Sequence, residues 1–208
     1  MSTFFQHFRS FGAKPQGRGF TLIELLAVVS IMLILTSVLL LRQQQFDSST
    51  ILRSLSYGVA LSIRQAQTYG TSVREFGGTF DAEAYGVHFC RGCSNYYILF
   101  ADRNDDGLRA QDGSEDVDTV RIGQRFTISK ICGRLASCGA ERCSSDASVP
   151  IDWLNVYFRR PSPDARFRSS ISSDVYSTVY VQLMSPGGSA RSITVYPTGQ
   201  IAVGTLDS

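Results

Sequence analysis

Residues 17–41 read GRGFTLIELLAVVSIMLILTSVLLL, the longest apolar run in the sequence. From Phe20 to Leu41, 17 of 22 residues are apolar, and Glu24 is the only charged residue. A helix of this length rises about 33 Å, which is enough to cross the roughly 30 Å hydrocarbon layer of a membrane. The stretch therefore predicts a transmembrane helix over residues 20–41.

Positive charge precedes the apolar stretch. Arg9, Lys14 and Arg18 lie there with no acidic residue among them, and such charge is retained on the cytoplasmic side of a membrane. We therefore expect a single pass through the cytoplasmic (inner) membrane, with the N-terminus in the cytoplasm and the C-terminal domain outside it. A cleaved secretory signal has a shorter apolar region followed by an A-x-A-like site, and this sequence has neither feature.

The run GRGFTLIELL, with Gly19 before Phe20 and a carboxylate at Glu24, resembles the class III signal of type IV prepilins and type II secretion pseudopilins. The resemblance implies that residues 1–19 are a leader peptide, that a prepilin peptidase cleaves after Gly19, and that Phe20 is then N-methylated. It also implies that Glu24 pairs with the methylated N-terminal amine of an adjacent subunit during assembly. A carboxylate in hydrocarbon is costly and usually has a functional partner. The alternative for Glu24 is a lone carboxylate near the end of an ordinary anchor.

The helix is expected to continue through residues 42–72, outside the cytoplasm, because no Gly or Pro interrupts the chain before Gly58. Gly70 is a candidate C-cap. The segment LRSLSYGVALSIRQAQTYGTSV also resembles the second half of the N-terminal helix in the minor pseudopilin H family. Apolar residues recur at helical spacing and predict a stripe that packs on a sheet: Ile51, Leu52, Leu55, Val59, Ile63, Ala66 and Tyr69.

Residues 73–208 predict a β-rich globular domain, because short β-rich runs alternate there with turn-forming clusters. A long helix followed by strands indicates an α+β, pilin-like fold in which the helix packs on an antiparallel β-sheet or a small β-sandwich. Residues 197–199 are expected to turn the last hairpin. The predicted strands are Tyr85–Phe89, Tyr96–Ala101, Thr119–Ile122, Phe126–Ile131, Leu154–Arg159, Thr178–Met184, Ser192–Tyr196 and Gln200–Val203.

An acidic segment offers a candidate calcium site. Asp102, Asn104 and Asp106, followed by Gly107, match the first positions of an EF-hand-like loop, which lets three oxygens converge on one hard cation. A glycine stands at position 12, where a bidentate Glu belongs, so Asp112 or Glu115 would have to complete the site. The alternative is a solvated loop in which Asn and Asp close tight turns. No other cofactor is expected.

The five cysteines are Cys90, Cys93, Cys132, Cys138 and Cys143. Structural disulfides are favoured because the predicted topology places all five in an oxidising compartment, and the odd number leaves one unpaired. A zinc site made of Cys90, Cys93, Cys138 and Cys143 is an alternative, although a single CxxC is a weak zinc signal. A redox-active CxxC is a third, and no thioredoxin-like pattern surrounds it.

Arg159, Arg160, Arg166 and Arg168 surround residues 161–165, where Asp164 is the only acidic residue. Such a loop could contact the phosphates of nucleic acid. The alternative interpretation is a solvated loop or a contact between subunits.

Composition and missing motifs argue against an enzyme. The net charge of +2 excludes a strongly polybasic or polyacidic protein. His88 is the only histidine that remains after the predicted cleavage, which limits imidazole chemistry. No nucleophile motif and no nucleotide-binding glycine motif accompanies it. We therefore expect a structural subunit of a type II secretion pseudopilus or type IV pilus, whose partners are other pilin or pseudopilin subunits, the prepilin peptidase and the cytoplasmic membrane. The alternative is a minor pilin that binds DNA during DNA uptake.

Overall fold

The computed structural model describes residues 19–72, 74–80, 82–123 and 125–205, except for the side chains of residues 41–47. All of the predicted leader except Gly19 lies outside the described residues. The described chain forms one long helix, α1 (Leu22–Thr71), followed by ten strands: β1 (Ala84–Cys90), β2 (Tyr96–Asp102), β3 (Asp116–Arg121), β4 (Thr127–Leu135), β5 (Glu141–Cys143), β6 (Trp153–Arg159), β7 (Ala165–Ser169), β8 (Tyr176–Met184), β9 (Ala190–Val195) and β10 (Ile201–Gly204).

Residues 1–43 form one unit of the chain and residues 44–208 form another. In the first unit, the apolar part of α1 contains three hydroxyl side chains that bond to the helix itself. Ser30 donates to the carbonyl of Leu26 at 2.8 Å, and Ser37 donates to that of Leu33 at 2.7 Å. Thr36 donates in the same way to the backbone one turn earlier. The hydroxyls are thus satisfied within the helix, as hydrocarbon surroundings require.

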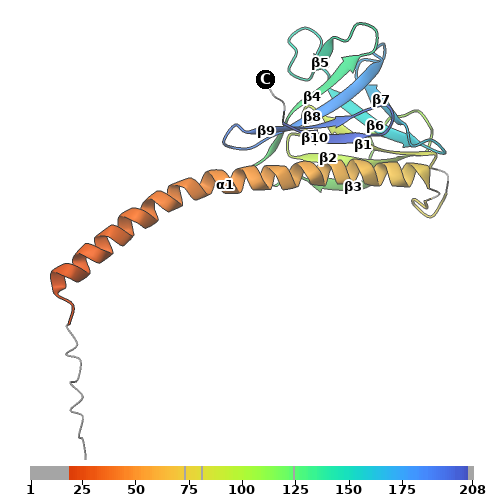
Figure 1. The fold of residues 1–208 in the computed structure, drawn as a ribbon. Coiled ribbons are helices and arrows are strands. Elements are labelled where there is room, and N and C mark those ends of the chain that lie inside the picture. The colour runs from red at the N-terminus through yellow and green to blue at the C-terminus, as the bar shows by residue number, and fades with distance from the viewer. Residues whose placement is uncertain (1–18, 73, 81, 124, 206–208) are drawn as a thin grey trace, which may run out of the picture. The chain divides into compact units, whose positions relative to one another are not determined.

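In the second unit, α1 packs on the strands through most of the predicted stripe (Figure 1). Its buried members are Leu52, Val59, Ile63 and Ala66, each at most 2% exposed. Ile51 was predicted to belong to this stripe and does not, because it is 47% exposed on another face of the helix.

Gly70 is not the C-cap that the sequence predicted. The residue lies within α1, which continues to Thr71, and a Cβ atom at this position would collide with the backbone carbonyl of Phe158 in β6. Gly70 therefore permits the helix and a strand to approach closely, which is a packing role and not a capping role.

The strands form two antiparallel five-stranded sheets, ordered β3-β2-β1-β6-β7 and β10-β9-β8-β4-β5. Buried residues of α1 and of both sheets belong to one core cluster, including Ile63 of the helix, Val156 of β6 and Val181 of β8. The fold is therefore α+β and pilin-like, as predicted. The last hairpin turns at residues 197–199, where Gly199 has a φ of 77°.

Each predicted strand overlaps an observed one, and the prediction missed β5 and β7. Strand β7 corrects the interpretation of the arginine-rich segment as a loop. The chain makes a tight turn after Arg159 and returns as β7, which pairs with β6 and places Arg166 opposite Tyr157 and Arg168 opposite Asn155. Both arginines are exposed, whereas Ala165 and Ser169 are buried.

Candidate processing and assembly site

The start of α1 defines the surroundings of the predicted processing residues. Gly19, Phe20 and Thr21 are non-helical, and the helix begins at Leu22. The Thr21 hydroxyl accepts a hydrogen bond from the backbone N–H of Glu24 at 3.4 Å, while the Thr21 carbonyl accepts from Leu25 at 3.1 Å. Thr21 is therefore the N-cap, and Glu24 stands at the third helical position, which is the T-x-x-E spacing of a capping box.

The peptide bond between Gly19 and Phe20 lies outside the hydrogen-bonded helix. The Phe20 side chain is 78% exposed, and a Cβ atom at Gly19 would meet no other atom within 4 Å. The bond predicted to be cleaved is therefore sterically accessible in this structure. Glu24 lies one turn into the helix, where the N–H groups of the first turn favour a negative charge.

The helix that follows exposes a long apolar surface. Leu22–Leu40 has a mean hydropathy of 2.6, and none of it is buried by the rest of the described chain. Apolar surface of this extent is unfavourable in water, so it needs a covering of lipid or of other protein. The segment is long and apolar enough to cross a membrane.

A prokaryotic N-terminal methylation motif matches residues 15–40, a range that includes Gly19, Phe20 and Glu24. The match supports a type IV pilin-like protein made as a prepilin. Together with the apolar helix, it fits a protein anchored in a membrane. No curated protein and no solved structure matches the chain.

The four predicted calcium ligands close the turns of their own loop. Asp102 accepts a hydrogen bond from the Gly107 N–H at 2.8 Å, and Asp106 accepts from the Leu108 N–H at 2.7 Å. Asn104 donates to Asp106, and Asp112 accepts from the backbone and the hydroxyl of Ser114. Within the described residues, no group of three or more His, Cys, Asp or Glu side chains is placed to hold a metal ion. These bonds show that the loop closes its own turns, and calcium binding there stays a prediction from the spacing.

Asp102 has a different electrostatic environment from the other acidic residues of this loop. The residue is fully buried, and its Oδ1 atom has no hydrogen-bond partner in the described structure. Burial raises the pKa of Asp102 to about 6, against the opposing effect of the hydrogen bond from Gly107. By contrast, hydrogen bonds from Ser114 lower the pKa of the exposed Asp112.

The cysteines form two disulfides, Cys90–Cys93 and Cys132–Cys143, and Cys138 is free and exposed. Cys132 and Cys143 face each other in register on the neighbouring strands β4 and β5. The zinc set that the sequence offered is not formed, because its members Cys90, Cys93 and Cys143 are all in disulfides. Sequence reasoning left this connectivity open.

The predicted nucleic-acid contacts divide into two groups. The Arg159 guanidinium forms ion pairs with Glu83 at 2.8 Å and with Asp105 at 2.7 Å. Arg166 and Arg168 lie two residues apart on the edge strand β7, so they project from the same face. In the described part of the chain, Arg166, Arg168 and Arg160, which lies at the turn, have no acidic partner, unlike Arg159.

Sequence reasoning missed two contacts. The T-x-x-E spacing of Thr21 and Glu24 is a recognisable capping signal that the sequence interpretation did not use. The second contact joins His88 of β1 to the buried Asn155 of β6, with 2.6 Å between His88 Nδ1 and Asn155 Oδ1. No sequence signal points to this pair, because its members are 67 residues apart and are brought together only by strand pairing.

Proposed function

We propose that this protein is a structural subunit of a type II secretion pseudopilus or a type IV pilus. It is inserted in the cytoplasmic membrane as a prepilin, cleaved after Gly19, N-methylated at Phe20 and assembled into a filament. The observation that carries the proposal is the exposed apolar helix Leu22–Leu40, which begins within the matched methylation motif. Pilin-like proteins with this motif are structural subunits, and the proposal assigns no catalysis to the chain.

In this proposal, lipid and then other subunits cover the apolar surface of the helix in turn. Before assembly, lipid covers Leu22–Leu40, the N-terminus is cytoplasmic, and the β domain is outside the cytoplasm. After assembly, the helices of neighbouring pilin or pseudopilin subunits cover the same side chains, while the β domain faces outward. Transfer between two apolar environments costs little hydrophobic free energy, so specific polar contacts must direct it. Resemblance of the segment after the membrane span favours a minor subunit of the H type.

Glu24 supplies such a polar contact. After cleavage, Phe20 carries a positively charged methylated amine, and Glu24 lies four residues away in the sequence. A carboxylate and an amine from two adjacent subunits neutralise each other, which removes the cost of two unpaired charges in an apolar surrounding. The prepilin peptidase is the partner that creates this amine. Incorporation of Glu24 variants into filaments tests this role.

A second candidate function is DNA binding by a minor pilin, and the exposed pair Arg166 and Arg168 favours it. Both guanidiniums project from one face of an edge strand and could follow a phosphate backbone. Gel retardation of DNA by the full chain, at low and at moderate salt, tests this function. The double variant Arg166→Ala/Arg168→Ala should lose retardation, whereas Arg159→Ala should keep it. Absence of retardation at low salt by the unmodified protein would exclude this function.

A further inference from the structure

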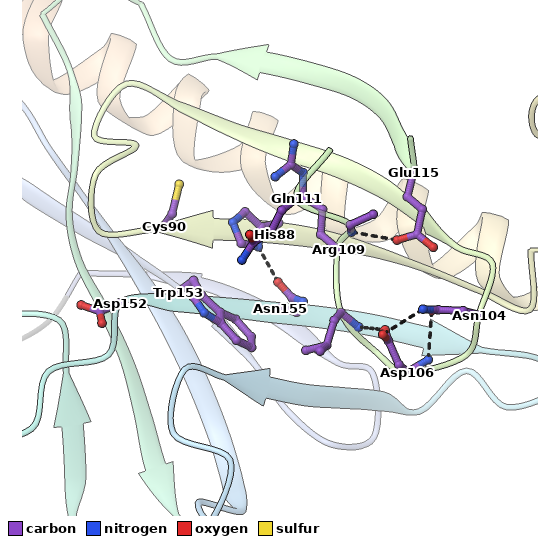
Figure 2. A pocket seen from close by; sticks show the side chains of 12 residues that line it. His88, Cys90, Asn104, Asp106, Arg109, Gln111, Glu115, Asp152, Trp153 and Asn155 are labelled. Atoms are coloured by element: carbon purple, nitrogen blue, oxygen red, sulfur yellow. Dashed lines mark hydrogen bonds between the residues drawn. The ribbon is translucent and has the colours of Figure 1, made fainter. Parts of the chain in front are cut away.

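A cavity of about 330 Å³ lies between strands β1 and β6 and the loop that joins β2 to β3 (Figure 2). Strand β1 contributes His88, and β6 contributes Trp153 and Asn155. Gln111 reaches the cavity from the loop, where it is exposed at the rim. A volume near the lower end of the range for ligand pockets suits a molecule of about one or two small rings.

The buried amide of Asn155 determines which hydrogen-bonding group His88 presents. The Nδ2 group of Asn155 donates to the Gly107 carbonyl at 3.1 Å, so its Oδ1 atom accepts the proton of His88 Nδ1. Burial lowers the pKa of His88, which favours the neutral ring. A neutral imidazole protonated at Nδ1 has an acceptor at Nε2. His88 can therefore accept a hydrogen bond from a ligand hydroxyl.

An aromatic plane lies beside this acceptor. The indole of Trp153 stacks on the His88 ring, with 6.3 Å between ring centroids and 29° between planes. Both rings line the cavity, so they form an aromatic part of its wall. An indole combines a large apolar face with a polar N–H, which suits ligands that have both apolar and polar surfaces.

The one arginine in the lining is paired with an acid, whereas the lining carboxylates Asp106 and Glu115 accept hydrogen bonds from neutral donors. Arg109 makes two hydrogen bonds to Asp116, at 2.5 and 2.6 Å. Both oxygens of Glu115, which is 5% exposed, accept backbone N–H groups, those of Arg103 and Ala110. No free cation in the lining awaits an anion, and the acidic lining residues Asp106, Glu115 and Asp152 disfavour one. The remaining groups suit a neutral ligand rich in hydroxyls.

We propose that this cavity binds a neutral saccharide unit, such as a hexose or the terminal sugar of a glycan. The apolar C–H face of the sugar contacts Trp153, and its hydroxyls bond to His88 Nε2 and to the Gln111 amide. This proposal adds a function to filament assembly, because the β domain of the subunit would bind a ligand. It uses no residue of the processing or assembly site, so either proposal can fail without the other.

Trp153 gives a direct measurement, because it is the only tryptophan of the chain. The full chain is placed in lipid nanodiscs, which avoids detergents with sugar headgroups. It is then titrated with glucose, galactose, mannose and N-acetylglucosamine while Trp153 fluorescence is recorded. At least one sugar should give a saturable change with a dissociation constant of about 1 to 10 mM, the range expected for a ligand of about a dozen heavy atoms. Glycerol at matched viscosity should give none.

Matched variants assign the response to the cavity. Gln111→Ala should weaken binding about 2- to 10-fold, as expected for one lost hydrogen bond. Gln200→Ala removes an exposed glutamine outside the cavity and should bind like the unmodified protein. In the Trp153→Phe variant, ¹⁵N NMR of His88 replaces fluorescence, and sugar should shift the Nε2 resonance less than in the unmodified protein. His7→Gln removes the other histidine signal.

Three results would overturn the proposal. The first is the lack of a saturable response to every sugar up to about 100 mM, far above the expected dissociation constant. The second is an equal loss of binding in Gln111→Ala and Gln200→Ala. The third is a response to lysine methyl ester and not to any sugar, which would make the cavity a site for cationic groups.

Discussion

Gly70 in the last turns of helix α1 lies so close to the backbone carbonyl of Phe158 in β6 that no Cβ atom fits between them. We expect Gly70→Ala to lower the free energy of unfolding by about 2 to 3 kcal/mol, because helix and strand must separate. Gly58→Ala is the matched control. Gly58 is in the same helix with open space around it, so alanine there should raise the free energy of unfolding by about 0.5 to 1 kcal/mol. Denaturant titration followed by Trp153 fluorescence measures both, and equal effects would contradict the close contact.

We expect Asp102 to make the free energy of unfolding depend on pH between about pH 4 and pH 6. Its pKa is about 6 in the folded protein, against 3.8 as the ordinary value. Between these values the folded chain binds more protons than the unfolded chain, so the free energy of unfolding falls as pH rises from about 4 to about 6. The contribution is on the order of 1 to 3 kcal/mol, and it is constant above that window.

The variant Asp102→Asn keeps an acceptor for the Gly107 N–H and removes the titration. Its free energy of unfolding should therefore fall less between pH 4 and 6 than that of the unmodified protein. Asp112→Asn, in the same loop, should retain the fall, because hydrogen bonds lower the pKa of Asp112. Denaturant unfolding at several pH values checks both variants. An unchanged slope in Asp102→Asn would contradict the burial of a titrating carboxyl there.

The disulfide between Cys132 and Cys143 should stabilise the second sheet. Replacing both residues by alanine should lower the free energy of unfolding by about 2 to 3 kcal/mol, since the bond closes a loop of 11 residues. Cys138→Ala should have little effect, because Cys138 is exposed and free. Mass spectrometry after alkylation without reduction should find the label on Cys138 alone. Labelling of Cys90 or Cys93 would contradict the observed pairing.

The helix and eight strands were predictable because hydrophobic period and turn residues report local structure. Strand β7 was missed although its sequence alternates, with Ala165 and Ser169 buried and Arg166 and Arg168 exposed. The arginines of this segment led to its interpretation as a loop. Strand β5 has three residues, which is too short for a hydrophobic alternation to be recognised. It pairs with β4, where Cys143 lies opposite Cys132.

The candidate sites also differ in how much of them the sequence alone could predict. Gly19, Phe20 and Glu24 follow from a local motif, so sequence alone could propose them. The loop at residues 102–115 has the spacing of a calcium site, which stays a prediction. The bonds from its carboxylates to its own backbone are contacts that the spacing does not reveal. The contact between His88 and Asn155 depends on the register of β1 and β6, which only the fold provides.

Glu24 is expected to act through its charge and not through its position in the capping box. Glu24→Ala should leave cleavage intact and reduce incorporation into filaments at least about tenfold, because an unpaired amine in an apolar surrounding is costly. Glu24→Gln is the critical comparison, since glutamine also suits the third position of a capping box. It should fail to the same extent as alanine. Quantitative blotting of sheared filaments measures incorporation. Normal incorporation of Glu24→Gln would assign Glu24 to capping alone.

The first residue of the mature chain shows whether this protein is processed as a prepilin. The full chain is expressed with a prepilin peptidase, and also without it, and membrane-extracted protein is analysed by N-terminal sequencing and mass spectrometry. We expect the chain to begin at N-methylated Phe20 when the peptidase is present, and to retain residues 1–19 when it is absent. A mature chain that begins at any other residue, or a leader retained in the presence of a peptidase that processes a known prepilin in the same cells, would contradict the assignment of this protein as a prepilin.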